Sequence, residues 1–356
     1  MEDYRIDSHK LMFHPKRVAE WCEGKFVYPI NTEVGLAGAC NHRCVFCAVD
    51  YMGYKPQFLT KEVLHERFAE MYEKGLRSVL FAGTGEPLLN KDVVNIINDT
   101  KNIGVDVALS TNGVLLEESI TRECMGAISW IRFSVSAGTE QTYKNIHRGK
   151  DGDLERVFHN IYTAACLKKQ HGWKTVLGVQ IVMVPENENE ILTLARKVKE
   201  LGADQFSVKS VGWQPLSNEE LKKFDRVSYY EHCEELKDQL SQLSDEKFRA
   251  IFRSNRASKP KIGKTYKECY AMPFHVNIDA NGDVWPCCTL VGMDGMSFGN
   301  IYQNTFEEIW RGDRRKCVIE KINDMNLKEC SPECKLDDMN RYLHELKYPN
   351  AHINFI

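Results

Sequence analysis

Short apolar runs alternate with longer amphipathic segments between residues 33 and 210. The short runs are rich in β-branched and aromatic residues, which predicts strands, whereas the longer ones repeat their apolar positions with helical spacing. Successive units of this kind are typical of a parallel sheet. The predicted strands are Glu33 to Gly38, Ser78 to Gly83, Asp106 to Ser110, Trp130 to Ser136, Thr175 to Val184 and Gln205 to Val208.

The predicted helices between these strands are Lys61 to Lys74, Asp92 to Ile103, Leu154 to Lys169 and Glu188 to Leu201. Thr60 is suited to cap the first of them, and Gly75 and Gly202 follow the last apolar positions of two helices. Parallel strands joined by helices place their C-terminal ends at one edge, where barrels and open sheets bind ligands. We therefore expect functional side chains at this edge.

Residues 211 to 265 have a different pattern, polar and mostly helical, and end in a basic run. The run contains Lys247, Arg249, Arg253, Arg256, Lys259, Lys261 and Lys264. Such a run is either a solvated linker or a wall that binds phosphate or carboxylate groups. From residue 266 the density of cysteines rises, which predicts a second, small domain.

Composition narrows the classes of protein that remain. The 356 residues are 43% hydrophobic and 27% charged, with a formal net charge of -3, so no overall attraction to nucleic acid or membranes is expected. The first residues lack the apolar stretch of a secretory signal, and no run of about 18 apolar residues occurs. We expect a cytoplasmic protein, in which 13 cysteines favour metal or cluster binding over disulfides.

Three of these cysteines, Cys40, Cys44 and Cys47, have the spacing C-x3-C-x2-C. Iron-sulfur cubes normally have four cysteine ligands, so three from one loop would leave one iron open to bind a substrate or cosubstrate. Zinc is the alternative for such closely spaced thiolates. A disulfide framework fits this crowded, odd number of cysteines poorly.

The loop, with Phe46 directly before Cys47, resembles the signature of radical S-adenosylmethionine (SAM) enzymes. The resemblance implies a [4Fe-4S] cluster whose open iron binds the amino and carboxylate groups of SAM. Reductive cleavage of SAM then gives a 5'-deoxyadenosyl radical that abstracts hydrogen from a substrate.

Further motifs follow in the order that this family shows. The turn Gly83-Thr84-Gly85-Glu86-Pro87 resembles the family's Gly-Gly-Glu-Pro segment, which receives the methionyl amino group of SAM, although Thr84 replaces one glycine. Ser110 and Asn112, in Ser-Thr-Asn-Gly, resemble an element at the edge of the cofactor; an Asn-Gly turn is the alternative.

The resemblance also assigns residues on the later strands. It implies that Ser134 and Arg148 bind the methionine carboxylate, and that Ser136 stands where relatives have an acidic residue. Gln180 is expected to face the ribose or adenine, and Ser207 or Lys209 to point at the substrate.

A second set of cysteines lies near the C-terminus: Cys269, Cys287, Cys330 and Cys334. Asn281-Gly282 is a two-residue turn signal that would bring Cys269 and Cys287 to one end of a β-hairpin. The four sulfurs would then form a closed site for an iron-sulfur cluster, with zinc as the alternative. Cys288 and Cys317 are each a spare ligand, a hydrogen-atom donor or a buried thiol.

This second set resembles the twitch or SPASM extension of radical SAM enzymes. Its ligand count favours the single-cluster twitch, and the resemblance implies an auxiliary cluster of [4Fe-4S] type. The predicted fold is α/β, a partial (β/α)6 TIM-type barrel followed by a small cysteine-rich α+β domain of hairpin and helix. The expected segments are an extension at 1–29, the barrel at 30–210, a helical basic linker at 211–265, the auxiliary-cluster domain at 266–340 and a tail at 341–356.

The resemblance implies an oxidoreductase or epimerase that abstracts hydrogen from a small polar, carbohydrate-like substrate such as a sugar, aminocyclitol or nucleotide-sugar. Cys288 and Lys209 are the candidate catalytic residues. Flavodoxin or ferredoxin is the expected electron donor, with neither nucleic acid nor membrane as partner. A radical SAM enzyme that modifies ribosomally made peptides is the alternative, and an iron-sulfur electron carrier without SAM chemistry is a further one.

Overall fold

A ten-stranded sheet organises the part of the chain that the computed structural model describes, namely residues 8–223, 234–253, 263–327, 330–331 and 334–355. The strand order is β10-β9-β8-β1-β2-β3-β4-β5-β6-β7, with β1 to β7 and β8 parallel and with β9 and β10 antiparallel to their neighbours. The strands are β1 (Asn31–Val34), β2 (Ser78–Phe81), β3 (Asp106–Thr111), β4 (Ile128–Ser134), β5 (Val176–Val182), β6 (Gln205–Lys209), β7 (Arg249–Phe252), β8 (His275–Ile278), β9 (Asp283–Trp285) and β10 (Gly299–Asn300).

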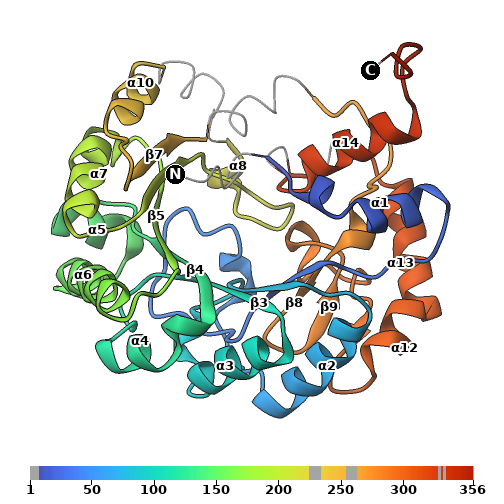
Figure 1. Ribbon diagram of the computed structural model, residues 1–356, viewed down its shortest axis with the longest axis horizontal. Helices are drawn as coiled ribbons and strands as arrows, with labels where there is room; N and C mark the ends of the chain where they lie inside the picture. The colour runs from blue at the N-terminus through green and yellow to red at the C-terminus, as the bar shows by residue number, and fades with distance from the viewer. Residues whose placement is uncertain (1–7, 224–233, 254–262, 328–329, 332–333, 356) are drawn as a thin grey trace.

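Helices cover the outer face of the parallel strands (Figure 1). The helices of the barrel region are α2 (Lys61–Glu73), α3 (Val93–Ile103), α4 (Glu118–Cys124), α5 (Glu140–His147), α6 (Asp153–His171) and α7 (Ile191–Glu200). The others are α1 (Pro15–Cys22), α8 (Glu219–Lys223), α10 (Glu234–Gln242), α12 (Phe306–Arg311), α13 (Asp313–Asp324) and α14 (Asp337–Lys347). Within the described residues, no helix is both long and apolar enough to span a bilayer.

Buried and partly exposed residues alternate along the strands, which explains why helices cover one face of the sheet. In β4 and β6, for example, Ile131, Phe133, Phe206 and Val208 are buried, as the side of a sheet that lies under helices requires. Many of the intervening positions are polar and partly exposed: they include Glu33, Ser110, Arg132, Ser134, Ser207 and Lys209. Others on the same side, such as Leu80 and Val182, are apolar. We call this side of the curved sheet the lumen face.

The predicted partial barrel is confirmed, and each of the six predicted strands is present with its ends shifted by a few residues. The expectation that residues 211–265 are mostly helical is wrong for 249–252, because these residues form β7 and extend the sheet beside β6. Nor is the sheet of the cysteine-rich segment separate, since β8 pairs in parallel with β1. The five segment boundaries stay a prediction.

The hairpin between β8 and β9 differs in its turn from the one predicted. The Asp279 N–H donates to the Asp283 carbonyl and the Gly282 N–H to the Asp279 carbonyl, which makes a three-residue loop. Gly282 has φ +86°, whereas Asn281 is not among the residues of positive φ. A type I turn followed by a glycine in the left-handed region fits this pattern, because a two-residue type I′ turn would need positive φ at both positions.

The C-terminal segment packs on the first half of the barrel through α12. The Glu70 carboxylate on α2 accepts hydrogen bonds from the backbone N–H groups of Phe306 (2.8 Å) and Glu307 (2.6 Å). Trp310, fully buried on α12, donates its indole N–H to the Val27 carbonyl at 3.0 Å. A carboxylate at the first N–H groups of a helix satisfies donors that have no partner within the helix.

We predict that Glu70→Ala lowers the free energy of unfolding by about 1 to 3 kcal/mol, because two partly buried N–H groups lose a charged acceptor. The measurement is denaturant unfolding of the metal-free protein under anaerobic, reducing conditions. Glu66→Ala is the matched control on the same helix, since Glu66 is exposed and its ion pair with Arg67 lies at the surface. Equal, small losses in both variants would show that α12 does not depend on this contact.

Candidate functional site

The three N-terminal cysteines lie on the loop that follows β1. Cys40, Cys44 and Cys47 are free thiols, and none of them is exposed. Burial raises the pKa of Cys40 to about 12 and also raises the pKa of Cys44, where the neighbouring Cys47 and Cys40 add to the effect. Three partly buried thiols with raised pKa values stay protonated unless a cation compensates the charge of the thiolates, and the iron of a cluster would do so. The donor set therefore fits an iron-sulfur centre.

Each of these sulfurs has a hydrogen-bond partner. The Tyr54 hydroxyl donates to Cys47 Sγ at 2.9 Å, and the His42 backbone N–H lies 3.5 Å from Cys40 Sγ. His147 Nδ1 lies 3.1 Å from Cys44 Sγ. Hydrogen bonds to ligand sulfurs are one of the factors that set the properties of iron-sulfur clusters.

The glycine turn after β2 touches the backbone of the cysteine loop. A Cβ on Gly85 would lie 2.2 Å from the Ala39 carbonyl oxygen and 2.4 Å from that of Ala37, so no larger residue fits here. Gly83 has φ +110°, and a Cβ there would lie 3.1 Å from Gly35 Cα. The Glu86 N–H also donates to the Ala39 carbonyl at 2.8 Å. The turn and the loop are therefore fitted to each other through their main chains.

Glu86 is buried and joins the ends of β2 and β3. Its carboxylate accepts hydrogen bonds from the Thr111 hydroxyl (2.6 Å), the Asn112 N–H (2.8 Å) and the Leu88 N–H (3.1 Å). Burial raises the pKa of Glu86, against the effect of these three hydrogen bonds. The Asn112 side chain in turn donates to Asn41 Oδ1 at 2.7 Å, within the cysteine loop. Two of the predicted cofactor residues are thus brought together beside the first cysteines.

The other predicted residues on the strands occupy their C-terminal edge or the lumen face. Ser110 accepts a hydrogen bond from Arg132 Nε at 3.1 Å across β3 and β4. Ser134 and Gln180 are partners in the register of β4 and β5, and Lys209 ends β6. These positions agree with an edge site, but their contacts with a cofactor stay a prediction.

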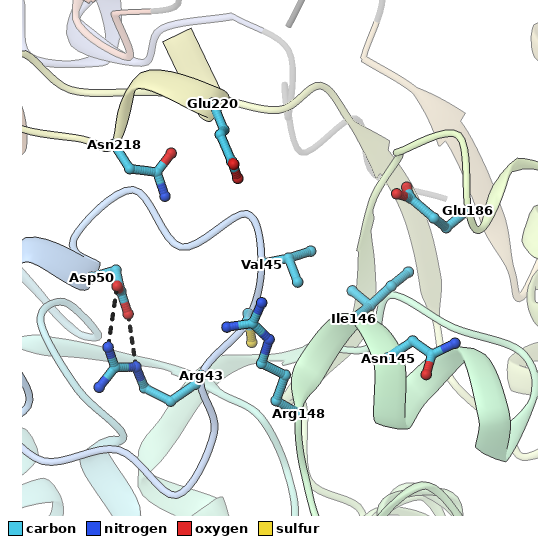
Figure 2. Close-up of a pocket in the computed structure, with 10 residues that line it drawn as sticks. Arg43, Val45, Asp50, Asn145, Ile146, Arg148, Glu186, Asn218 and Glu220 are labelled. Carbon is cyan, nitrogen blue, oxygen red and sulfur yellow. Dashed lines mark hydrogen bonds and ion pairs between the residues drawn. The ribbon is translucent and has the colours of Figure 1, made fainter. Parts of the chain in front are cut away.

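Arg148 and Cys44 both line a cavity of about 330 Å³ (Figure 2). Arg148 ends α5 in the left-handed region with φ +53°, a conformation that costs a non-glycine residue energy. Val45 and Arg43 also line the cavity, and Arg43 forms an ion pair with Asp50 at 2.8 Å. Ser134 is not among the described residues that line this cavity, and a shared site for the methionine carboxylate stays a prediction for the two residues.

Ser136, which the resemblance leads us to expect in place of an acidic residue, has a structural contact. It is fully buried, and its hydroxyl accepts a hydrogen bond from the Val182 N–H at 3.1 Å. It therefore joins the edges of β4 and β5 and does not point into an open site.

The second set of cysteines surrounds one apolar cavity. Cys269, Cys287, Cys330 and Cys334 line it together with Met272, Leu290 and other apolar side chains. Burial raises the pKa of Cys269 to about 11 and raises the pKa of the other three thiols as well. Two buried and two partly buried thiols around one apolar cavity fit the ligand set of a cluster without an open position.

The two remaining candidate cysteines, Cys288 and Cys317, differ in their exposure. Cys288 follows Cys287 and is partly buried. Cys317 is exposed on α13 and so is not a buried thiol. Within the basic run, Lys264 lines the second cysteine cavity and donates to the Cys330 carbonyl at 3.5 Å. Arg256, Lys259 and Lys261 lie outside the described residues.

Several residues at these sites were not identified from sequence. His147 and Tyr54 contact the first cysteine set, but neither forms a spacing motif with it. Glu33 and Lys335 form an ion pair that links β1 to the segment between Cys334 and α14. Adjacency was the one available signal, since His147 precedes Arg148 and Lys335 follows Cys334.

Two family models match the chain. Residues 35–198 match the radical SAM superfamily, and residues 269–335 match SPASM, an iron-sulfur cluster-binding domain. The two matches imply a [4Fe-4S] cluster, SAM and an auxiliary iron-sulfur cluster. The family and cofactors expected from the motifs are therefore confirmed, whereas the individual ligands remain assignments.

Similar known proteins include two enzymes named GTP 3',8-cyclase. That of Clostridium botulinum strain Langeland is 26% identical over 271 residues, which are 71% of this chain and 79% of the relative. That of Aquifex aeolicus is 34% identical over 176 residues, which are 48% of this chain and 52% of the relative. The structure of Streptococcus suis SuiB bound to precursor peptide SuiA has a TM-score of 0.69 at 16% identity, covering 98% of this chain and 82% of SuiB. This last likeness concerns the fold alone.

We predict that Glu86→Gln lowers the free energy of unfolding of the metal-free protein by about 1 to 3 kcal/mol. All three partners of Glu86 are donors, so the amide NH₂ of glutamine would face at least one of them. Denaturant unfolding measures the loss. Glu118→Gln is the control, because Glu118 is exposed and pairs with Arg122 on the surface. A loss no greater than in this control would contradict the role of Glu86 in joining β2 to β3.

Proposed function

Because the chain belongs to the radical SAM superfamily and carries an iron-sulfur cluster-binding domain, we propose that it reductively cleaves SAM and abstracts hydrogen from a small polar substrate. The observation that carries this proposal is the fit of the glycine turn against the cysteine loop, where Gly85 leaves room only for backbone. Neither a scaffold protein nor a simple electron carrier needs such a turn beside its cysteines.

In this proposal Cys40, Cys44 and Cys47 hold the first cluster. When bound, this cluster supplies the electron that cleaves SAM to methionine and a 5'-deoxyadenosyl radical. The turn at residues 83–87 receives the methionyl amino group, and Arg148 attracts the carboxylate from the neighbouring cavity. Ser134 and Gln180, adjacent in the register, orient the rest of the cosubstrate.

We place the substrate on the lumen face. Burial opposes the ionisation of Glu33 on β1, but the ion pair with Lys335 and, to a smaller extent, Arg132 on β4 lower its pKa. This face of the sheet therefore carries charged side chains of both signs. Such groups suit hydroxyl, amino and phosphate substituents better than apolar ones.

A sugar, an aminocyclitol or a nucleotide-sugar satisfies these requirements. The names of the sequence relatives refer to GTP, which carries both a ribose and phosphates, and so favour the nucleotide end of this class. A ribosomally made peptide is the second candidate, since SuiB has this fold and was solved with a precursor peptide.

Two outcomes are consistent with the residues present. In dehydrogenation, the substrate gives a hydrogen atom to the 5'-deoxyadenosyl radical, one electron to the auxiliary cluster and one proton to a base, for which Lys209 is the candidate. In epimerisation, a thiol returns a hydrogen atom to the other face, for which Cys288 is the candidate. The thiyl radical that remains takes up one proton and one electron, which the external reductant would supply by way of the auxiliary cluster. The second outcome leaves the substrate at its original oxidation level.

We predict that anaerobically reconstituted protein, reduced with dithionite, forms 5'-deoxyadenosine from SAM, and that the Cys40→Ala/Cys44→Ala/Cys47→Ala variant forms none. The variant should retain iron at the second site, because the two cysteine sets are separate. Chromatography of the nucleoside and iron analysis are the measurements. Equal formation in both proteins would refute the proposal, and loss of all iron in the variant would refute separate sites.

The substrate class is tested with deuterated candidates. Sugars, nucleotide-sugars, nucleotides and short peptides, each uniformly deuterated, are supplied with SAM, and deuterium in 5'-deoxyadenosine is measured by mass spectrometry. Transfer from a carbohydrate or nucleotide supports the proposed class. Transfer from peptides alone would select the peptide alternative.

We also predict that Cys269→Ala/Cys330→Ala retains uncoupled formation of 5'-deoxyadenosine but loses the oxidised product. The reason is that the first cysteine loop is intact, whereas the electron acceptor is missing. Cys317→Ala is the control, since Cys317 is exposed on α13 and lines neither cysteine cavity among the described residues. Undiminished product formation by the double variant would contradict a role for the second site in turnover.

A further inference from the structure

The cysteine loop is hydrogen-bonded to the C-terminal end of α5. The Arg43 N–H donates to the His147 carbonyl at 3.1 Å, and the Val45 N–H donates to the Ile146 carbonyl at 2.9 Å. Backbone bonds therefore flank Cys44 on both sides. The last residues of α5 have a fixed position relative to this one cysteine.

The other end of α5 is also anchored. Glu190 accepts hydrogen bonds from the Gly138 N–H (2.6 Å), the Thr139 hydroxyl (2.8 Å) and the Thr142 hydroxyl (2.7 Å). Thr139 also caps the first turn of the helix. The helix is thus a rigid support for its final side chain, His147.

The imidazole of His147 is fully buried and contacts one partner through each nitrogen. Its Nε2 lies 2.8 Å from the Ser136 backbone nitrogen, and its Nδ1 lies 3.1 Å from Cys44 Sγ. A backbone N–H can only donate, so Nε2 must be the acceptor. The neutral ring then carries its proton on Nδ1, which makes it a donor to the sulfur.

The position of this proton decides whether His147 binds a metal ion together with His42 and Cys44 or donates a hydrogen bond to Cys44. The ligand atoms of His42, Cys44 and His147 lie within 4.8 Å of one another, a spacing that a metal ion could bridge. A protonated Nδ1 has no lone pair for a metal, however. The Ser136 contact therefore assigns His147 to hydrogen bonding and not to coordination.

We propose that His147 is a positioning residue that donates an N–H···S hydrogen bond to the Cys44 ligand of the first cluster and thereby raises its reduction potential. This inference rests on the proposed function, because it takes Cys44 as a ligand. When an external reductant such as dithionite delivers one electron, negative charge on the cluster and its sulfurs increases. A donor aimed at a sulfur stabilises the reduced state more than the oxidised state.

The test compares His147→Leu, which removes the donor, with His147→Asn, whose side-chain amide can donate from a similar position. Each reconstituted variant is titrated potentiometrically, and the first cluster is followed through the EPR signal that changes when SAM is added. We expect a more negative midpoint potential for the leucine variant and a smaller shift for the asparagine variant.

His65→Asn is the matched control, since His65 is an exposed histidine on α2 that pairs with Asp99. It should leave the potential unchanged. A leucine variant with a normal SAM-responsive signal and an unaltered potential would overturn the inference alone. Wild-type protein that forms no SAM-responsive cluster would overturn the proposed function, and this inference with it.

A second measurement uses the wild-type protein, so it does not depend on how the variants fold. Pulsed EPR of the reduced protein, labelled with histidine that carries ¹⁵N in the imidazole ring only, should detect a weakly coupled ¹⁵N nucleus through the hydrogen bond from His147. Absence of any ¹⁵N coupling would contradict the N–H···S contact. A strong coupling, of the size found for nitrogen bound to iron, would show that a histidine is a ligand and would equally overturn the proposal.

Discussion

The architecture depends on hydrogen bonding at both edges of β1. This strand pairs in parallel with β2 on one side and with β8 on the other. The first cysteine loop leaves its C-terminal end, while β8 belongs to the hairpin that separates Cys269 from Cys287. One strand thus fixes the geometry of both cysteine sites through main-chain bonds, which side-chain substitutions do not remove. The Lys335 and Glu33 ion pair adds a second link between the two regions.

Around this strand the protein separates apolar from polar surface by simple alternation. Residues such as Phe133 and Phe206 are buried under the helices, whereas Arg132 and Ser207 occupy the opposite face of the same strands. Period-two alternation therefore creates both the core and a polar region that lies within reach of the edge motifs. Arg132 on β4 is among the groups that lower the pKa of Glu33 on β1, as expected for strands of one curved sheet.

Local patterns predicted much of this organisation because the barrel repeats one local unit. Strands such as β2 and β4 have enough apolar residues to be recognised alone, and Gly75 and Gly202 have the positive φ values that follow helix ends. Thr60, by contrast, occupies the N-cap of α2 without a side-chain bond, and its N–H donates to the Tyr302 hydroxyl. β7 was not predicted because the strand has only four residues and lies among charged residues of the basic run. The contacts of His147 and Tyr54 arise from tertiary packing, which no spacing along the chain encodes.

The central claim is that the first cysteine loop holds a cluster with an iron open to SAM. The most direct measurement is the EPR spectrum of the reduced Cys269→Ala/Cys330→Ala protein, in which the first cluster is observed alone, recorded before and after addition of SAM. The account predicts a spectrum of a reduced [4Fe-4S] cluster that changes when SAM binds. A cluster signal that SAM leaves unaltered would contradict it.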